Sequence, residues 1–242
     1  MAVQKHNDSL EKIAAEVSGC PLCRLARTRN NAVPGEGQLA ARIMFIGEAP
    51  GRSEDQKGRP FVGAAGRILD ELLHKAGIER SQVFITNVVK CRPPHNRVPE
   101  DDEVAACRPY LDRQIAQIKP KVICILGRTA YASLLGGGSI TTNRGKIVER
   151  GGQKYFLTFH PAAAIYNKNL IAALEADLKS WQKRSRRVKA GFPWRIICEL
   201  PPRRVLSESH RSCGKGPDWE TAGAHDNKER QGTQVVRQDR GN

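Results

Sequence analysis

Three polar side chains in this 242-residue sequence are suited to bind and activate a small organic substrate. Glu48, Asn87 and His160 each stand at the end of a short apolar run, far from one another in the sequence. A carboxylate can position water, an amide can donate and accept hydrogen bonds together, and an imidazole can donate a proton. The same residues also have common structural uses, as a helix cap, a turn residue and a buried histidine. Their function therefore depends on whether the fold brings them together.

Four apolar runs predict the strands that position these side chains. Each has three to five residues between turn residues, the pattern of a buried parallel strand: Ile43–Ile46, Val83–Ile85, Val122–Leu126 and Tyr155–Phe159. Helical spacing of apolar residues occurs at 9–17, 68–73, 104–118, 130–135 and 170–178. This alternation predicts an α/β fold, a three-layer αβα sandwich with a four-stranded parallel central sheet. Ligands bind at the carboxyl ends of such strands, so we expect Glu48, Asn87 and His160 to share one cleft.

The composition divides the chain near residue 183. Residues 1–182 are expected to form the folded domain, whereas residues 183–242 hold 14 Lys and Arg against 7 Asp and Glu and lack apolar periodicity. The second part is therefore predicted to be a basic, disordered tail.

The net charge of +15 suits a polyanion such as nucleic acid, although a solvated basic surface explains it equally well. The first ten residues are polar and no run of 18 apolar residues occurs, so we expect a cytoplasmic protein without a membrane span. The protein is also expected to be a monomer.

The seven cysteines suggest a metal site rather than disulfides, because their number is odd and no signal peptide precedes them. Cys20 and Cys23 form a C-x2-C pair, and Cys91 and Cys107 follow far along the chain. Four thiolates suit either zinc or an iron–sulfur cluster, and spacing alone does not choose between them. Cys124 lies in a predicted strand and is expected to be an inert core residue.

The motifs around these residues resemble the family 4 (type-4) uracil-DNA glycosylases. The similarity extends from about Cys20 to Trp181, and several multi-residue motifs follow in the same order: Gly47–Gly51, Glu54–Asp55, Gly58–Gly63, Thr86–Pro94, Asn96–Arg97 and His160–Ala163. The resemblance implies the fold predicted above and a monofunctional DNA glycosylase. Such an enzyme excises uracil from uracil-containing DNA by hydrolysing the N-glycosidic bond, which initiates base excision repair.

The resemblance implies catalytic roles for Glu48, Ala49 and His160. The target base must be flipped out of the duplex before its glycosidic bond can be reached. His160 would then donate a hydrogen bond to uracil O2 as negative charge develops there. Glu48 would position water and stabilise the cationic sugar. Classical uracil glycosylases carry an Asp where Ala49 stands, so the Ala49 backbone is expected to help hold the water.

Uracil binding is assigned to Asn87, Phe61 and Glu54. Asn87 can accept from uracil N3–H and donate to O4, whereas cytosine reverses both partners. Phe61 would stack on the flipped ring, or else belong to the core. Glu54 would exclude the methyl group of thymine, or else form a surface salt bridge.

DNA contact is assigned to Asn96 and Arg97 and to the segment after the histidine motif. Ile165 and Tyr166 would enter the duplex as the base leaves it, and Lys168 would meet a phosphate. A simple helix start is the alternative for this segment.

The resemblance also places a [4Fe-4S] cluster on Cys20, Cys23, Cys91 and Cys107, with a structural role. Two other functions stay open from the sequence. One is a relative that traps uracil covalently through a histidine in a basic loop, whose motif is missing here although His95 is present. The other is a non-catalytic DNA-binding module that carries a metal site.

Overall fold

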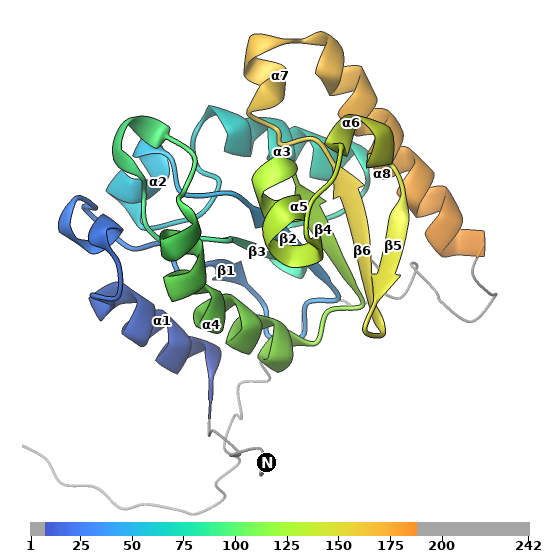
Figure 1. Cartoon of the computed structure of the whole chain (residues 1–242). Coiled ribbons are helices and arrows are strands. Elements are labelled where there is room, and N and C mark those ends of the chain that lie inside the picture. Colours follow the sequence, from blue (N-terminus) through green and yellow to red (C-terminus); the bar gives the residue numbers. More distant parts are fainter. Residues whose placement is uncertain (1–7, 188–242) are drawn as a thin grey trace, which may run out of the picture. The chain divides into compact units, whose positions relative to one another are not determined.

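A six-stranded sheet lies at the centre of residues 8–187, which are the residues that the computed structural model describes, with side chains as far as Trp181 (Figure 1). The strand order is β1-β3-β2-β4-β6-β5. The strands are β1 (Glu36–Gly37), β2 (Ile43–Gly47), β3 (Phe84–Asn87), β4 (Val122–Leu126), β5 (Ile147–Arg150) and β6 (Gln153–Thr158). The four inner strands are parallel, and β1 and β5 pair antiparallel at the two edges.

The four predicted parallel strands are confirmed, but the sequence prediction missed both edge strands. Strand β1 has only two residues and no apolar run. Strand β5 is largely exposed, because it lies at the edge of the sheet and neither of its faces is fully covered by a helix. Its hairpin with β6 turns through Gly151 and Gly152, both at positive φ, and this Gly-Gly pair was the available sequence signal.

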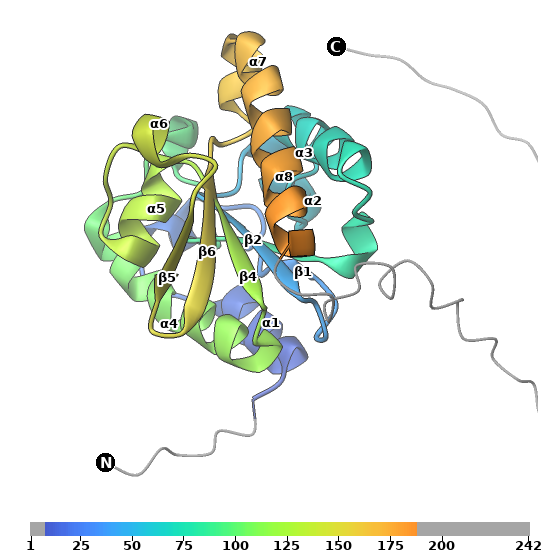
Figure 2. The ribbon, with the colours of Figure 1, turned by 90° about the vertical axis from the view of Figure 1, so that its right-hand side faces the viewer.

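Helices cover both faces of the sheet, as Figure 2 shows with the sheet between two helical layers. One face packs against α1 (Leu10–Gly19), α4 (Asp101–Ile118) and α5 (Arg128–Leu135), and the other against α3 (Ala64–Lys75) and α8 (Asn169–Arg187). The remaining short elements are α2 (Arg52–Lys57), α6 (Ile140–Asn143), α7 (Ala163–Tyr166), η1 (Arg24–Arg27), η2 (Arg80–Gln82) and η3 (Pro94–Asn96). The predicted αβα sandwich is therefore confirmed.

The alternation of side chains along the inner strands explains the two layers. In β2, Met44 and Ile46 belong to the core on the α4 side, whereas Ile43 and Phe45 belong to the core on the α3 side. Successive side chains of a strand point to opposite faces, so a run that is apolar throughout must be covered twice. Burial of each such side chain contributes about 1.5–3 kcal/mol.

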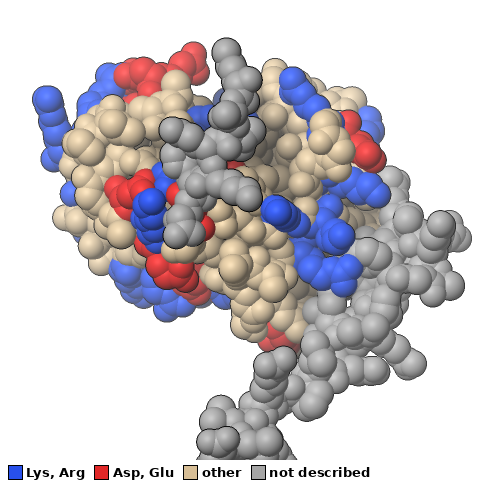
Figure 3. Space-filling view, turned by 90° about the horizontal axis from the view of Figure 1, so that it is seen from below, with Lys and Arg blue, Asp and Glu red and all other residues tan. Residues whose placement is uncertain are grey.

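The charges on one face and the C-terminal end of helix α8 can be compared with the sequence predictions about net charge and the basic tail. Viewed from below, toward the amino ends of the parallel strands, this face of the molecule carries both Lys and Arg and Asp and Glu (Figure 3). Helix α8 continues to Arg187, past the predicted boundary at residue 182. Residues 188–242 lie outside the described residues, and the tail stays a prediction. Within 8–187, no helix is long and apolar enough to cross a membrane.

Candidate active site

A cavity of about 460 Å³ lies at the carboxyl ends of the parallel strands. It is lined by residues that follow β2, β3 and β6, and by residues from the loops before α3 and α4. Ten of the residues predicted from the sequence line it: Glu48, Ala49, Glu54, Phe61, Asn87, Asn96, Arg97, His160, Ile165 and Tyr166. Lys168 is not among the lining residues. The fold thus brings the acid, the amide and the imidazole to one place.

Asn87 presents a buried acceptor without a partner. Its side chain is only 1% exposed and lines the cavity, yet Oδ1 makes no hydrogen bond to any described residue. A buried acceptor left unpaired costs about 1–3 kcal/mol, so native structures keep few of them without a reason. The cavity therefore suits a ligand that offers a donor to this oxygen.

Gly47 makes room for this amide. It pairs with Asn87 across β2 and β3. A Cβ atom at this position would lie 2.5 Å from Asn87 Oδ1 and 2.7 Å from Phe61 Cζ. Only glycine therefore lets the amide and the aromatic ring approach each other at the end of the sheet.

His160 is held as a neutral imidazole with a defined tautomer. Its Nδ1 accepts a hydrogen bond of 3.1 Å from the backbone N–H of Ala162. Because Nδ1 is the acceptor, the ring proton is on Nε2. Burial lowers the pKa of His160 to about 4, against a smaller opposing effect of Glu54. The imidazole at neutral pH is therefore an uncharged donor.

Phe61 belongs to the cavity wall and to the core at once. Its ring stacks on the His160 ring with centroids 5.5 Å apart and an angle of 27°. It is 5% exposed and packs in the apolar cluster on the α3 side of the sheet. Its φ of +50° lies in the left-handed region, where residues other than glycine are uncommon. The two interpretations of Phe61 from the sequence are compatible.

Glu54 does not form the surface salt bridge that was one of its predicted alternatives. Its carboxylate accepts hydrogen bonds from the backbone N–H groups of Val62 (2.9 Å), Gly63 (2.8 Å) and Gly51 (3.1 Å). The side chain is 9% exposed and lines the cavity. Glu54 therefore fixes the loop that carries Phe61 while it closes one side of the cavity.

Thr129 is a site residue that the sequence interpretation missed. Its hydroxyl donates a hydrogen bond to Oε2 of Glu48. Thr129 lies in the first turn of α5, directly after β4. The signal was available, because β4 is the fourth parallel strand and its carboxyl end also leads into polar sequence.

The loop between β3 and α4 carries Asn96 and Arg97, and both are engaged within the protein. Arg97 forms an ion pair with Glu103, whose side chain is fully buried, at 2.6 Å. Asn96 accepts a hydrogen bond of 2.7 Å from Arg92 and has a φ of +55°. These contacts fix the shape of the cavity wall, and they leave Arg97 half-buried rather than freely exposed.

Two large apolar side chains project at the edge of the cavity. Tyr166 is 91% exposed and Ile165 is 44% exposed, both in the single turn of α7. Lys168 follows this turn and is also exposed. The helix start that the sequence left as an alternative is present, and it is this helix that carries the exposed pair.

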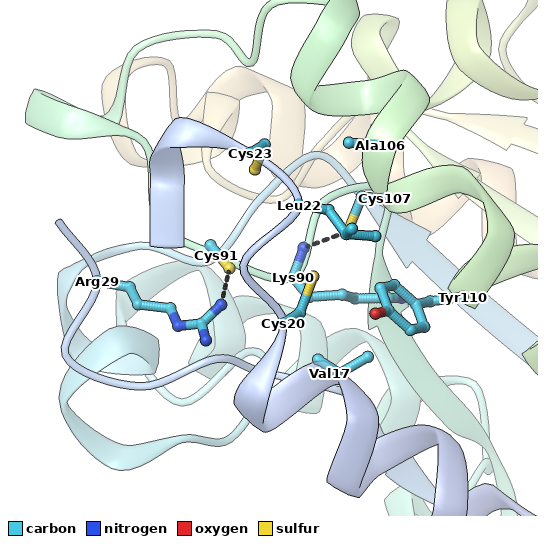
Figure 4. A pocket seen from close by; sticks show the side chains of 10 residues that line it. All are labelled: Val17, Cys20, Leu22, Cys23, Arg29, Lys90, Cys91, Ala106, Cys107 and Tyr110. Carbon is cyan, nitrogen blue, oxygen red and sulfur yellow. Dashed lines mark hydrogen bonds between the residues drawn. The ribbon is translucent and has the colours of Figure 1, made fainter. Parts of the chain in front are cut away.

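A second, small cavity is lined by all four cysteines of the predicted metal site (Figure 4). They come from the end of α1, the loop after it, the segment after β3, and α4. All four are free thiols. Arg29 Nη1 donates to Cys91 Sγ at 2.9 Å, and the backbone N–H of Lys90 donates to Cys107 Sγ at 3.3 Å.

Burial makes two of these thiols, Cys91 and Cys107, hard to ionise in the absence of a cation. It raises the pKa of Cys91, and it raises the pKa of Cys107 to about 11. Among the described residues, no group of three or more His, Cys, Asp or Glu could hold a metal ion as the side chains stand. Cys124 is fully buried in β4, as expected for a core residue.

Comparison with known proteins defines the class to which this site belongs. Residues 34–184 match the family model of the uracil DNA glycosylase superfamily, and the chain belongs to this superfamily.

Within it, three similar relatives are type-4 uracil-DNA glycosylases. The protein of Sulfurisphaera tokodaii is 58% identical over 182 residues, which cover 71% of this chain and 83% of the relative. Those of Saccharolobus solfataricus and Archaeoglobus fulgidus are 50% and 46% identical, over 71% of this chain and 84% and 91% of their own lengths. The chain is a member of the type-4 uracil-DNA glycosylase family.

Proposed function

We propose that the protein removes uracil from DNA by hydrolysing the N-glycosidic bond, as a monofunctional glycosylase that initiates base excision repair. The observation that carries this proposal is the unpaired Oδ1 of Asn87 in the wall of the cavity. Uracil supplies the missing donor with its N3–H group. Membership of the type-4 family supports the same substrate.

Asn87 distinguishes uracil from cytosine. Its amide oxygen accepts from N3–H while its amide nitrogen donates to O4 of the flipped base. Cytosine presents an acceptor at N3 and a donor at the exocyclic amine, so both contacts would be repulsive. A site built to pair with one base leaves its buried polar groups unpaired with the other, and this mismatch is a strong source of selectivity.

His160 stabilises the departing base. Its Nε2–H would donate a hydrogen bond to the atom that gains negative charge, which for uracil is O2. A donor fixed in place by the protein is typically worth about 3–4 kcal/mol in the transition state. Since the low pKa keeps His160 uncharged, it acts as a hydrogen-bond donor rather than as a source of a proton at neutral pH.

Glu48 holds the attacking water and faces the cationic sugar. Thr129 orients its carboxylate through the hydrogen bond to Oε2. The other carboxylate oxygen and the backbone at Ala49 are then free to position the water against the sugar.

The exposed pair at the edge of the cavity acts on the duplex. Ile165 and Tyr166 fill the space that the flipped nucleotide leaves, which offsets the cost of unstacking. Lys168 contacts a phosphate on the same side, and the basic segment after residue 182 adds non-specific attraction to DNA.

The four cysteines fit an iron–sulfur cluster. They are free, they line one cavity, and two cationic residues, Arg29 and Lys90, line it with them. When bound, a [4Fe-4S] cluster supplies a covalent tie between the end of α1, the segment after β3 and α4. To test this assignment, we measure the iron content, the sulfide content and the visible absorption of purified full-length protein. A colourless protein that contains zinc would contradict the assignment.

The proposed activity is tested with a labelled oligonucleotide that contains one uracil. We expect release of free uracil and a strand break only after alkali treatment, with no cleavage of the matched cytosine oligonucleotide. A break without alkali would indicate lyase activity, and an adduct that survives denaturation would indicate covalent trapping. Binding of the oligonucleotide without release of uracil would refute the proposal in favour of a non-catalytic module.

A further inference from the structure

Lys90 is the one fully buried lysine among residues 8–181, whose side chains the structure describes, and its ammonium group is held by three oxygen atoms. Nζ donates to Thr86 Oγ1 at 2.6 Å, to the backbone oxygen of Asn87 at 2.7 Å and to Gln114 Oε1 at 2.8 Å. The side chain is 1% exposed. All three protons of the ammonium group therefore have acceptors, and one of the acceptors is the backbone of the base-recognising asparagine.

The charge of this ammonium group is not balanced by any carboxylate in the part of the chain that the structure describes. None of the ion pairs there includes Lys90, and its three acceptors are all uncharged. A buried charge without a counter-charge is among the most costly features that a fold can contain. Neutral hydrogen bonds reduce this cost but do not remove the charge, so an anion close to Lys90 is to be expected.

The small cavity lined by Cys20, Cys23, Cys91 and Cys107, here called the cysteine cavity, is where the structure could hold such an anion. Lys90 lies between Asn87 and Cys91, lines this cavity, and has the Cys107 sulfur 3.3 Å from its own backbone nitrogen. A second cation, Arg29, reaches the same cavity, with its guanidinium 2.9 Å from Cys91 Sγ. Arg29 likewise has no carboxylate partner among the described ion pairs. An iron–sulfur cluster on four thiolates is anionic and would balance both (Figure 4).

We infer that Lys90 is a positioning residue that couples the cluster to base recognition: its ammonium group balances the charge of the cluster and holds the backbone of Asn87 in place. Arg29 also balances the charge of the cluster. It does not line the larger cavity that contains Asn87, here called the base pocket. This inference rests on the proposed function, because it requires both the cluster and the uracil-binding role of Asn87.

The proposed coupling between the cysteine cavity and Asn87 needs only the short hydrogen bonds of the Lys90 ammonium group. An anionic cluster in the cysteine cavity would attract the ammonium group, and the ammonium group holds the carbonyl oxygen of Asn87 through a hydrogen bond of 2.7 Å. The side chain of the same residue, Asn87, carries the unpaired Oδ1 in the cavity wall. Thr86 and Gln114 both donate to the backbone oxygen of Pro34, so the network is anchored on its other side.

The test compares full-length Lys90→Met with the wild type and with Lys121→Met, a matched substitution of an exposed lysine. We measure the midpoint reduction potential of the cluster in fully loaded protein, and KM and kcat on a uracil oligonucleotide. Loss of a cation beside an anionic cluster disfavours the added electron, so the potential of Lys90→Met should fall. The KM should rise about tenfold, the size of one lost charge-assisted hydrogen bond. Lys121→Met should change neither quantity.

Two further variants decide the question if Lys90→Met fails to fold or to retain iron. Arg29→Gln removes the other cation and should lower the potential. Gln114→Met leaves both charges in place but loosens the ammonium group, so it should raise KM and leave the potential unchanged. The inference is overturned if loaded Lys90→Met keeps either the wild-type potential or the wild-type KM, or if the two further variants keep the values they are expected to change. Absence of iron or of uracil release in the wild-type protein would instead refute the proposed function.

Discussion

The base pocket and the cysteine cavity are joined by the five-residue segment from Asn87 to Cys91, and they are built in opposite ways. The base pocket is open, with a volume of about 460 Å³, and one neutral acceptor in its wall lacks a partner. The cysteine cavity is small and is lined by thiols and two cations. The first arrangement suits a neutral ligand that enters and leaves, and the second suits an anionic group that stays. One strand end therefore leads into two cavities of different chemical character.

The largest effect within the base pocket is expected from His160→Ala. Loss of the fixed donor should reduce kcat for uracil release by about 10²–10³-fold, with little change in KM, because the donor acts mainly in the transition state. Iron content should stay at the wild-type level, which separates the two regions. The matched control is His74→Ala, an exposed histidine at the end of α3. A change in KM alone would contradict the assigned role.

Asn87→Asp is expected to act on selectivity. A carboxylate cannot donate to uracil O4, so kcat/KM for uracil should fall about tenfold to a hundredfold. A protonated carboxyl group can donate to N3 of cytosine and accept from its amine, so the ratio of cytosine to uracil excision should rise. Parallel kinetics on two oligonucleotides that differ in one base measure this ratio. An unchanged ratio would show that Asn87 does not read the base.

Much of this site could be predicted from the sequence because strand topology determines it. The apolar runs identified four parallel strands, and the rule that ligands bind at their carboxyl ends placed Glu48, Asn87 and His160 together. The edge strands were missed because β1 is two residues long and β5 is mostly exposed. Their stability comes from pairing with a neighbour, which local sequence does not record.

What the sequence could not supply is how each side chain is held. Glu54 fits a salt bridge and a backbone clamp equally well in the sequence, and only the folded loop shows that it bonds three backbone N–H groups. The position of Thr129 after a strand end was a usable signal, but its hydrogen bond to Glu48, 81 residues away, becomes visible only in the folded chain. Lys90 was counted as part of a motif, whereas its burial and its three acceptors depend on packing among β3 and α4.

Gly47→Ala tests whether the base pocket depends on close approach rather than on charge. The added Cβ would lie 2.5 Å from Asn87 Oδ1, so the amide or the Phe61 ring must move. We expect an increase of about tenfold in KM for uracil, since a displaced amide loses one hydrogen bond to the base. Gly19→Ala is the control, because no atom lies within 4 Å of its added Cβ. Equal kinetics for the two variants would refute the steric argument.

Tyr166→Ser tests the duplex side of the base pocket and should have a smaller effect. The side chain is 91% exposed, so its loss should change neither the folding of the protein nor its activity on single-stranded DNA. With duplex DNA, where unstacking must be offset, KM should rise by about threefold to tenfold. Leu39→Ser removes another exposed apolar side chain, one that does not line the cavity, and serves as the control. The same loss on both kinds of DNA would argue against a wedge.

The smallest effect concerns the pH dependence of stability. The pKa of His160 is lowered by burial to about 4 from a usual value of about 6.5. The unfolded chain therefore binds more protons between these two values, so this residue's contribution to stability is complete above pH 6.5 and is lost as the pH falls toward 4. His160→Gln removes this contribution, and its melting temperature should fall less steeply than that of the wild type over this range, by on the order of a few degrees. Parallel slopes in calorimetry would show that folding does not lower the pKa of His160, and the ring would then become charged below pH 6.5 and lose the hydrogen bond that it accepts from Ala162.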